Sequence, residues 1–445
     1  MRKKTINASK YFILPLFLAF IMFLGGVSMS AAEELAKVID KSNCTQYKDL
    51  LVPALYRAVE RGDFVLNTAP KLNYEYKYDK KFLEASEKNA GKFEVDATGH
   101  LIDKKTGKIP FYNIYGRPFP HLDPKDPKYA DKIMYNFQWN KYRILGEHYQ
   151  NKVTWIDNKK GEHRYIWTNS YELMMTGRPP GQEFSEKDNP NHYIKMSIGM
   201  NMEPFDMFGT NQLIFDYMDD GDVTTFAYVP SIRRVRQSSG VVRSDPYFGS
   251  DAWQDLGFMW DGKNTWMNWK VVGEKTMLCP FSQVDLRHTT EDPDGTYHFN
   301  YAPIKIGFQD PNWKGAKWAL LNVVWVPRRV IVMEQLPKDP YYAWGLHINY
   351  MDKETDVIFM KEIHDKTGAF RTWSIAVYTK TVTPSGRDNV GMRDIQMTID
   401  EKARHATSGW VQNDTVNKEK SSMFMPKSRL SPDIFTKEYI MRMSK

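Results

Sequence analysis

The sequence predicts a mainly β protein that also carries helices, an α+β fold. From about residue 151 to 410, short segments alternate β-branched or aromatic residues with polar ones, and turn signals separate them. The aromatic content of 14% favours strand-rich packing over a helical bundle. A sheet of roughly ten or more strands cannot stay flat, so it must curl into a barrel, a half-barrel or a sandwich.

The first 32 residues have the organisation of a secretory signal peptide. Cations at positions 2–4 precede the almost unbroken apolar run Tyr11–Val27, and small residues lead to a predicted cleavage site after Ala32. The alternative is an uncleaved membrane anchor. The first cysteine, Cys44, does not follow the small residues directly. We therefore expect an exported, periplasmic protein that is not lipidated.

The charge balance argues against a nucleic-acid partner. Removal of Arg2, Lys3, Lys4 and Lys10 with the signal reduces the formal net charge from +7 to +3. A nucleic-acid-binding chain of this size would carry a concentrated basic surface. Four arginines do crowd into residues 233–243, but acidic residues flank them on both sides.

The regions that flank the predicted sheet contain fewer strand signals. Residues 33–65 have helical periodicity that ends near Gly62, and a second helix is predicted over 128–150. Between them, 66–130 is polar and rich in turn signals, which is typical of a segment that wraps over a core. The tail, residues 411–445, is polar, and we expect it to be peripheral.

The strand pattern is clearest at residues 213–237. Leu213–Tyr217 predicts a strand, Asp219–Asp222 a tight turn and Val223–Tyr228 the next strand. Pro230 and Ser231 then turn into a third strand, Ile232–Gln237. Three consecutive antiparallel strands predict a meander, and similar segments continue to about residue 410.

Motifs for catalysis or metal binding are not found in the sequence. The ten histidines lack metal-ligand spacing, and neither a His-Glu-x-x-His nor a Gly-x-Ser-x-Gly motif occurs. We expect no catalytic residue, metal or cofactor. Paired carboxylates for glycoside cleavage meet only in space, so they form the main enzyme alternative. Cys44 and Cys279 either pair as a disulfide in an oxidising compartment or remain isolated thiols.

Four stretches together resemble one known family. These are "FAYVPSIRRVRQSSGVVRSDPYFGSDAWQDL" at 226–256, "YGRPFPHLDPKDPKYADKIMYN" at 115–136, "NWKVVGEKTMLCPF" at 268–281 and "INYMDKETDVIFMKEIHDKTGAFRTW" at 348–373. The pattern is similar to outer-membrane lipoprotein-sorting-like proteins of the LolA/LolB-like superfamily, in the branch catalogued as domain of unknown function 1329. The resemblance extends over nearly the whole mature chain.

The resemblance implies a strongly curved antiparallel sheet that forms an incomplete, half-open barrel, with helices and loops over its open side. It implies a non-enzymatic protein whose apolar interior binds lipids, lipoproteins or other amphiphiles. An inner-membrane export pump of the resistance-nodulation type, or an outer-membrane protein, is the implied partner. Residues 151–410 would form the sheet domain, and residues 33–150 would pack on it.

Within residues 66–130, we expect the apolar stretch Ile114–Leu122 to be buried against the sheet and to anchor the segment there. Its two prolines, Pro118 and Pro120, fix an extended backbone path. The side chains that it offers for burial are Phe111, Tyr112, Tyr115 and Phe119.

Two sets of side chains are candidates for a binding site. The cavity candidates, which could equally be plain core, are Tyr247, Phe248, Trp253, Leu256, Phe258, Trp260, Trp266, Trp269 and Trp325. The head-group candidates are Arg233, Arg234, Arg236 and Arg243. On a strand, Arg233 would face one way with Val235, and Arg234 and Arg236 the other. The alternative for the arginines is surface pairing with Asp219, Asp220 or Asp222.

Two other functions stay open at this point. A carbohydrate-binding or glycoside-cleaving protein would present Trp260, Trp266, Trp269 and Trp325 as an exposed row near two carboxylates, whereas an enclosed cavity favours lipid. A structural adaptor would fill its own cavity, with residues 66–130 threaded into the half-barrel.

Overall fold

The structure is a computed structural model that describes residues 35–219, 221–238, 243–298, 304–411 and 421–444. The predicted signal peptide lies outside the described residues. Ala36–Lys445 form one compact unit. None of the helices in the described ranges is long and apolar enough to span a membrane.

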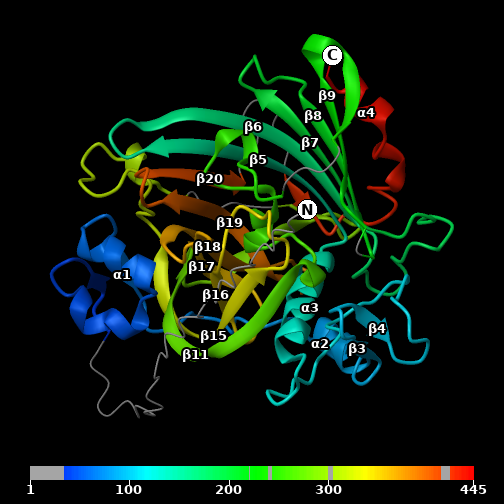
Figure 1. Cartoon of the computed structure of the whole chain (residues 1–445), viewed down its shortest axis with the longest axis horizontal. Helices are drawn as coiled ribbons and strands as arrows, with labels where there is room; N and C mark the ends of the chain where they lie inside the picture. Colours follow the sequence, from blue (N-terminus) through cyan, green and yellow to red (C-terminus); the bar gives the residue numbers. More distant parts are fainter. Residues whose placement is uncertain (1–34, 220, 239–242, 299–303, 412–420, 445) are drawn as a thin grey trace, which may run out of the picture. The chain divides into compact units, whose positions relative to one another are not determined.

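A long antiparallel series of strands organises this unit (Figure 1). The chain enters the series in the middle, because β5 pairs with β20 from the opposite end of the sequence. In spatial order the strands are β11 (Met267–Phe281), β15 (Val324–Pro337), β16 (His347–Asp352), β17 (Ile358–His364), β18 (Phe370–Val382), β19 (Asp388–Asp400), β20 (His405–Val411), β5 (Gly146–Asp157), β6 (Gly161–Met174), β7 (Tyr193–Glu203), β8 (Asn211–Tyr217), β9 (Thr224–Val229) and β10 (Arg234–Ser238).

The sheet is strongly curved and does not close into a barrel, which confirms the predicted α+β fold (Figure 1). Register shifts bend several strands, for example between Val271 and Gly273 of β11. At one end Phe281 of β11 lies beside Tyr378 of β18 in a parallel pair. The sheet is therefore mixed rather than purely antiparallel.

Short elements complete the chain. The small strands are β1 (Val38–Ile39), β2 (Leu66–Thr68), β3 (Phe93–Val95), β4 (Leu101–Asp103), β12 (Arg287–His288), β13 (Thr290–Glu291), β14 (Tyr297–His298) and β21 (Ser422–Met423). The α-helices are α1 (Pro53–Glu60), α2 (Lys80–Glu87), α3 (Tyr129–Tyr142) and α4 (Lys437–Arg442). The 3-10 turns are η1 (Cys44–Leu50), η2 (Pro230–Ile232), η3 (Tyr247–Gly249), η4 (Gln254–Met259), η5 (Asn264–Trp266), η6 (Gly307–Gln309) and η7 (Pro432–Ile434).

Both predicted N-terminal helices are shorter than expected. Of the predicted 33–65, the structure describes 35–65, and there the α-helix is limited to Pro53–Glu60, because Pro53 begins the helix after an extended residue and Gly62 follows its end with φ +77°. The helix predicted over 128–150 ends at Tyr142, and β5 begins at Gly146. The first long strand of the sheet therefore begins five residues before the expected boundary at 151.

The N-terminal segment joins the sheet through strand pairing and buried aromatics. β2 adds to the edge of β15 in a short parallel pair. The Tyr76 ring packs edge-on against Phe281 with centroids 5.0 Å apart, and its hydroxyl donates to the Val390 carbonyl at 2.5 Å. In the predicted anchor, Ile114 and Phe119 are buried and Tyr115 is half-buried. Phe111 and Tyr112, which precede the anchor and were also expected to be buried, are exposed.

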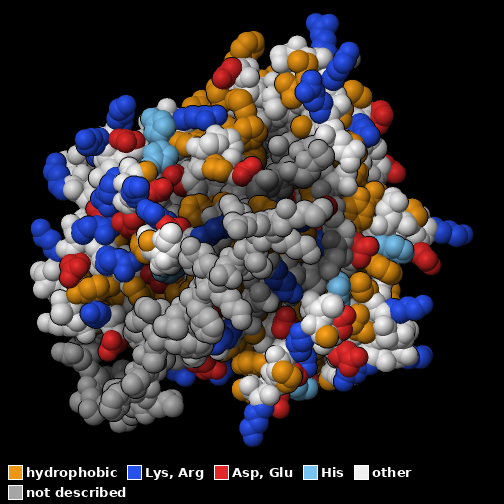
Figure 2. All heavy atoms as spheres, in the orientation of Figure 1, with side chains coloured by type: hydrophobic (Ala, Val, Ile, Leu, Met, Phe, Trp, Pro, Cys, Tyr) orange, Lys and Arg blue, Asp and Glu red, His pale blue; other side chains and the backbone are white. Residues whose placement is uncertain are grey.

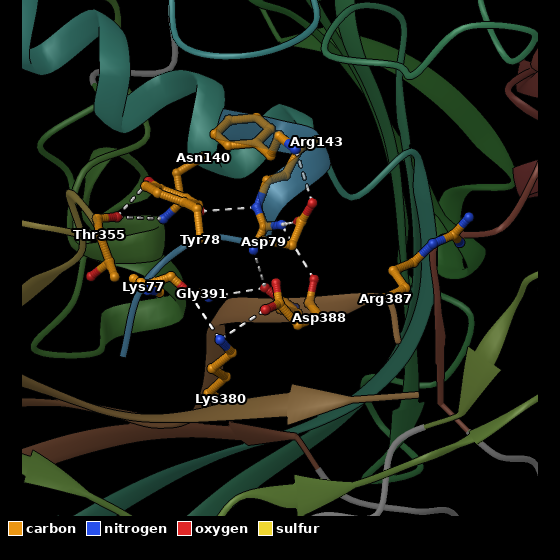
Figure 3. A network of polar contacts seen from close by, with 12 residues as sticks. Lys77, Tyr78, Asp79, Asn140, Arg143, Thr355, Lys380, Arg387, Asp388 and Gly391 are labelled. Atoms are coloured by element: carbon orange, nitrogen blue, oxygen red, sulfur yellow. Dashed lines mark hydrogen bonds and ion pairs between the residues drawn. The ribbon is translucent and has the colours of Figure 1, made fainter. Parts of the chain in front are cut away.

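A network of polar contacts fastens α2 and α3 to the sheet (Figure 3). The Arg143 guanidinium, just after α3, donates to the Asn389 side chain at 3.2 Å and lies 3.4 Å from the Asp79 carboxylate. Lys380 of β18 forms a 2.8 Å ion pair with Asp388 and donates to the Lys77 carbonyl at 3.0 Å. Two of these contacts join segments far apart in the sequence: Lys77 and Lys380 are 303 positions apart, and Arg143 and Asn389 are 246 positions apart.

The C-terminal segment, residues 421–444, is not peripheral. Its Met425, Leu430, Phe435 and Ile440 are buried in one cluster with residues of β6, β7 and β8. In Figure 1, α4 lies against β8 and β9. The mostly polar composition of this segment predicted a peripheral tail, but four well-spaced apolar side chains are enough to attach it to the sheet.

Candidate ligand-binding crevice

The two faces of β5–β8 have opposite chemistry. Side chains alternate along a strand, so one face carries Leu173, Met196 and Leu213, which the C-terminal segment covers. The other face carries Glu172, Lys195 and further polar side chains. We call this second face the inner face; it lies toward residues 243–264, which we call the cover segment.

A crevice runs between the inner face and the cover segment. Its larger part has a volume of about 290 Å³. Hydroxyl, amide and small side chains of β5–β8, β19 and β20 form most of its floor. The apolar part of the lining includes Val153, Ile198 and Ile214 from the sheet, and Tyr247, Trp253 and Leu256 from the cover segment. Two charged side chains, Glu172 and Arg393, also line this cavity.

The cover segment is held down by side chains of the sheet. Gln396 of β19 donates to the Leu256 carbonyl at 2.7 Å and accepts from the Met259 amide at 3.3 Å. Asp251 pairs with His405 of β20 at 2.6 Å. Phe258 and Met259 adopt positive φ angles of +49° and +69°. These left-handed conformations cost roughly 1 kcal/mol or more each, which the tertiary contacts must offset.

A second cavity of about 150 Å³ continues the crevice toward charged residues. It shares Glu172, Ser197, Ile214 and Gln254 with the larger cavity, so the two are adjacent. Its remaining walls include Lys195, Arg243 and several aspartates. A third cavity of about 60 Å³ shares Asp216 and Asp261 with the second and extends to α3.

Buried ion pairs organise the charged part of the crevice. Asp261 lies 2.8 Å from the Nζ atoms of both Lys141 and Lys195. Burial opposes the ionisation of Asp261, but the two ammonium groups hold its pKa well below the usual range. Lys195 also lies 3.9 Å from Glu172, whose pKa burial raises. Burial raises the pKa of Asp255, in the same cavity, to about 7.

Three of the nine aromatic and aliphatic candidates line the crevice: Tyr247, Trp253 and Leu256. Trp260 and Trp269 instead pack edge-on against each other with centroids 5.6 Å apart, and both are buried. The remaining four also lie outside the lining of the larger cavity: Trp325 is fully buried, Phe258 lies under Arg393, Trp266 under Arg243, and Phe248 joins the cluster of Val153, Trp155 and Ile166.

The four arginines do not act as one group. Arg233 has a φ of +49° and precedes β10, so it does not alternate with Arg234 as a strand residue would. Arg233, Arg234 and Arg236 are all exposed, and within the described part of the chain β10 pairs with β9 alone. Arg243 alone lines the charged cavity, where it forms a 2.9 Å ion pair with Asp222. That pair was the sequence-based alternative to a head-group site.

Cys44 and Cys279 are free, buried thiols, so the structure has the two isolated cysteines rather than the disulfide. In the part of the chain that the structure describes, no group of three or more His, Cys, Asp or Glu residues is arranged to hold a metal ion. Figure 2 shows acidic and basic side chains interspersed over the coloured part of the face that it presents.

Sequence reasoning missed the charged residues of the crevice, including Glu172, Lys195, Asp216 and Asp261. Each stands singly among apolar neighbours, so it reads as an ordinary polar position of an alternating strand or turn. The cross-strand register brings Lys195 opposite Asp216, and Glu172 opposite Ser197. That register depends on pairing between strands and leaves no motif in the sequence.

The fold and the crevice define a class of proteins in which an open, curved sheet holds a cavity beneath a covering segment. Within that class, the chain belongs to the family described as "Protein of unknown function (DUF1329)", whose model matches residues 38–440. The sequence-based resemblance to this family is thereby confirmed. No curated protein matches the sequence.

Three solved structures are similar to this chain at low identity. A putative outer membrane lipoprotein-sorting protein domain from Vibrio parahaemolyticus has 13% identity and a TM-score of 0.44, covering 68% of this chain and 96% of its own. A DUF1329 family protein from Desulfovibrio piger has 12% identity and a TM-score of 0.41, covering 69% and 98%. A LolA superfamily protein from Nitrosomonas europaea has 11% identity and a TM-score of 0.38, covering 70% and 98%.

Proposed function

We propose that this protein is a periplasmic, non-enzymatic binder of amphiphilic molecules. One observation carries the proposal: a single crevice presents an apolar surface at Tyr247, Trp253 and Leu256 and a charged surface around Lys195 and Glu172. An amphiphile has the same two parts in one molecule. The predicted export signal and the family resemblance support the periplasmic location.

The lining of the crevice changes the kind of ligand that we expect. A wholly apolar interior would bind an acyl chain by burial alone, whereas this crevice has a largely polar floor. Burial of about ten methylenes contributes roughly 8 kcal/mol. Micromolar binding requires about that much, and ordering costs oppose it. Polar contacts to a head group are therefore needed for useful affinity.

The proposal can be tested by a bulky substitution at a residue that lines the crevice, which should fill the space for the ligand. Gly199 of β7 lines the larger cavity, and a Cβ at this position would meet open space. Gly199→Trp should therefore fill the cavity without a backbone clash. We expect it to abolish saturable binding of a fluorescent alkyl probe, and native mass spectrometry of the detergent-free wild type should show a bound amphiphile.

The matched control is Gly273→Trp in β11, where a Cβ also meets open space and the residue does not line either of the two adjoining cavities. It should bind the probe like the wild type. Equal binding by the Gly199→Trp variant, or wild-type protein that is repeatedly empty and fails to bind the probe, would overturn the proposal.

Two features disfavour the alternative functions. The tryptophans that a sugar-binding row requires are largely internal, since Trp260, Trp269 and Trp325 are all buried. Among the described residues, the lining of the larger cavity includes none before Tyr149, so residues 66–130 do not fill it as a self-plugged adaptor requires. An export pump or outer-membrane partner is compatible with the proposal, and co-purification after crosslinking would test it.

A further inference from the structure

The charged cavity of about 150 Å³ is lined by carboxylate oxygens that receive no hydrogen bond. Glu172 Oε2, Asp216 Oδ1 and Asp255 Oδ2 have no hydrogen-bond partner among the described residues. All three residues line this one cavity. Glu172 and Asp255 are more than nine-tenths buried, with 8% and 2% exposure. Buried carboxylate oxygens without donors are costly, so their convergence on one space indicates a place for donor groups.

The cations near this cavity are already engaged elsewhere. Lys195 makes its 2.8 Å contact with Asp261 and stays 3.9 Å from Glu172. Lys263 donates to the Tyr217 carbonyl at 3.1 Å and stays 3.7 Å from Asp216. Arg243 is paired with Asp222. Acidic side chains thus outnumber basic ones on the cavity wall. Burial raises the pKa values of Glu172, Asp216 and Asp255, so a cation that enters the cavity favours the ionised form of these carboxyl groups.

The arrangement fits an organic cation better than a metal ion. The acidic side chains do not converge closely enough to form a metal site within the described ranges. An ammonium group has three N–H donors that point in different directions, and it can reach carboxylates on separate walls. A cavity of about 150 Å³ holds such a small group together with its first methylenes.

We propose that the ligand of this protein is a cationic amphiphile, whose primary ammonium group enters the cavity lined by Glu172, Asp216 and Asp255 and whose alkyl part lies in the larger cavity. This inference rests on the proposed function and deepens it by naming the ligand class. Glu172, Ser197, Ile214 and Gln254 line both cavities, so they mark the junction between head group and chain. The Trp253 and Tyr247 rings then lie beside the alkyl part.

The test compares three probes that share one alkyl chain: dodecylamine, dodecanol and dodecanoate, all used below their aggregation concentrations at pH 7. Intrinsic tryptophan fluorescence and competition with a fluorescent alkyl probe give the dissociation constants. We expect dodecylamine to bind at least tenfold more tightly than dodecanol, and dodecanoate to bind more weakly than dodecanol.

Three variants locate the effect. Glu172→Gln and Asp255→Asn keep the side-chain shape and remove a carboxyl group that can ionise against the bound ammonium. Each should reduce dodecylamine affinity about tenfold and leave dodecanol affinity unchanged. Asp206→Asn, at an exposed position outside the crevice, is the matched control and should change neither. Far-UV circular dichroism and thermal melts of each variant confirm that it is folded before it is compared.

The outcomes separate this inference from the proposed function. If dodecanol binds and Gly199→Trp blocks it, but dodecylamine binds no more tightly, the crevice binds amphiphiles and the ammonium proposal is wrong. Equal loss of affinity for dodecylamine and dodecanol in Glu172→Gln also contradicts it, because the carboxylate then acts on the chain or the fold. If none of the three probes binds, the proposed function itself fails.

Discussion

Arg287 and Asp394 show at the residue scale how buried charges hold the sheet together. Their side chains are almost fully enclosed, with contacts of 2.6 and 3.2 Å between guanidinium and carboxylate. Arg287→Met leaves the Asp394 charge uncompensated, and we expect the free energy of unfolding to fall by about 3–5 kcal/mol. Urea unfolding measures this loss. Arg233→Met, at an exposed position, should stay within about 0.5 kcal/mol of the wild type.

The ion pair between His405 and Asp251 makes the stability of the attached cover segment depend on pH. Burial lowers the pKa of this imidazole, but the hydrogen bond and charge of Asp251 outweigh burial and raise the pKa above its ordinary value. The ion pair therefore stabilises the fold fully below about pH 6.5, the unfolded value, and is lost as pH rises through the higher folded pKa. The contribution should be below about 1 kcal/mol, because the pair is partly solvated.

The measurement is the difference in melting temperature between the wild type and His405→Gln as a function of pH. The wild type should be the more stable at pH 5.5, and its advantage should decline toward zero as pH rises. A difference that is constant across this range would show that His405 acts through packing rather than through charge.

At the scale of elements, the C-terminal segment completes the apolar face of β6–β8. Phe435 is buried in that cluster with Leu173, Met196 and Ile440. Phe435→Ala should lower the free energy of unfolding by about 3–5 kcal/mol, since it removes a buried ring and leaves a cavity. Met443→Ala, an exposed apolar position in the same segment, should have little effect. Equal, small effects in both would contradict the tight packing of this segment.

At the scale of the whole molecule, the N-terminal segment and the sheet depend on each other. Tyr76 is buried and donates to Val390 of β19, Tyr78 is buried and donates to Thr355 in the turn between β16 and β17, and Arg143 bridges the end of α3 to β19. A fragment of residues 151–445 would also lose the first part of β5. We expect this fragment to be insoluble or to melt without cooperativity, measured by calorimetry. A soluble fragment that melts cooperatively near the full-length temperature would show that the segment is a separate domain.

Local signals in the sequence determined much of the fold. Period-two alternation and turn residues located the strands near 213–237 within a few positions, because these signals depend only on neighbouring residues. Gly116 illustrates a local signal that required structure to explain. Its φ is +88°, and a Cβ there would lie 2.5 Å from the Ser86 amide nitrogen, so only glycine allows α2 to approach this turn.

The sequence by itself determined the class of fold, the strand-rich region and the family. Only the tertiary structure decided which face of the sheet is polar, which of the aromatics line the crevice, and that Glu172, Asp216 and Asp255 converge on one cavity. The physical reason is the separation along the sequence between the residues that interact. Strand propensity and turns act between neighbours, whereas the crevice is made by cross-strand register and by a cover segment that Gln396 and His405 hold from more than 130 positions away.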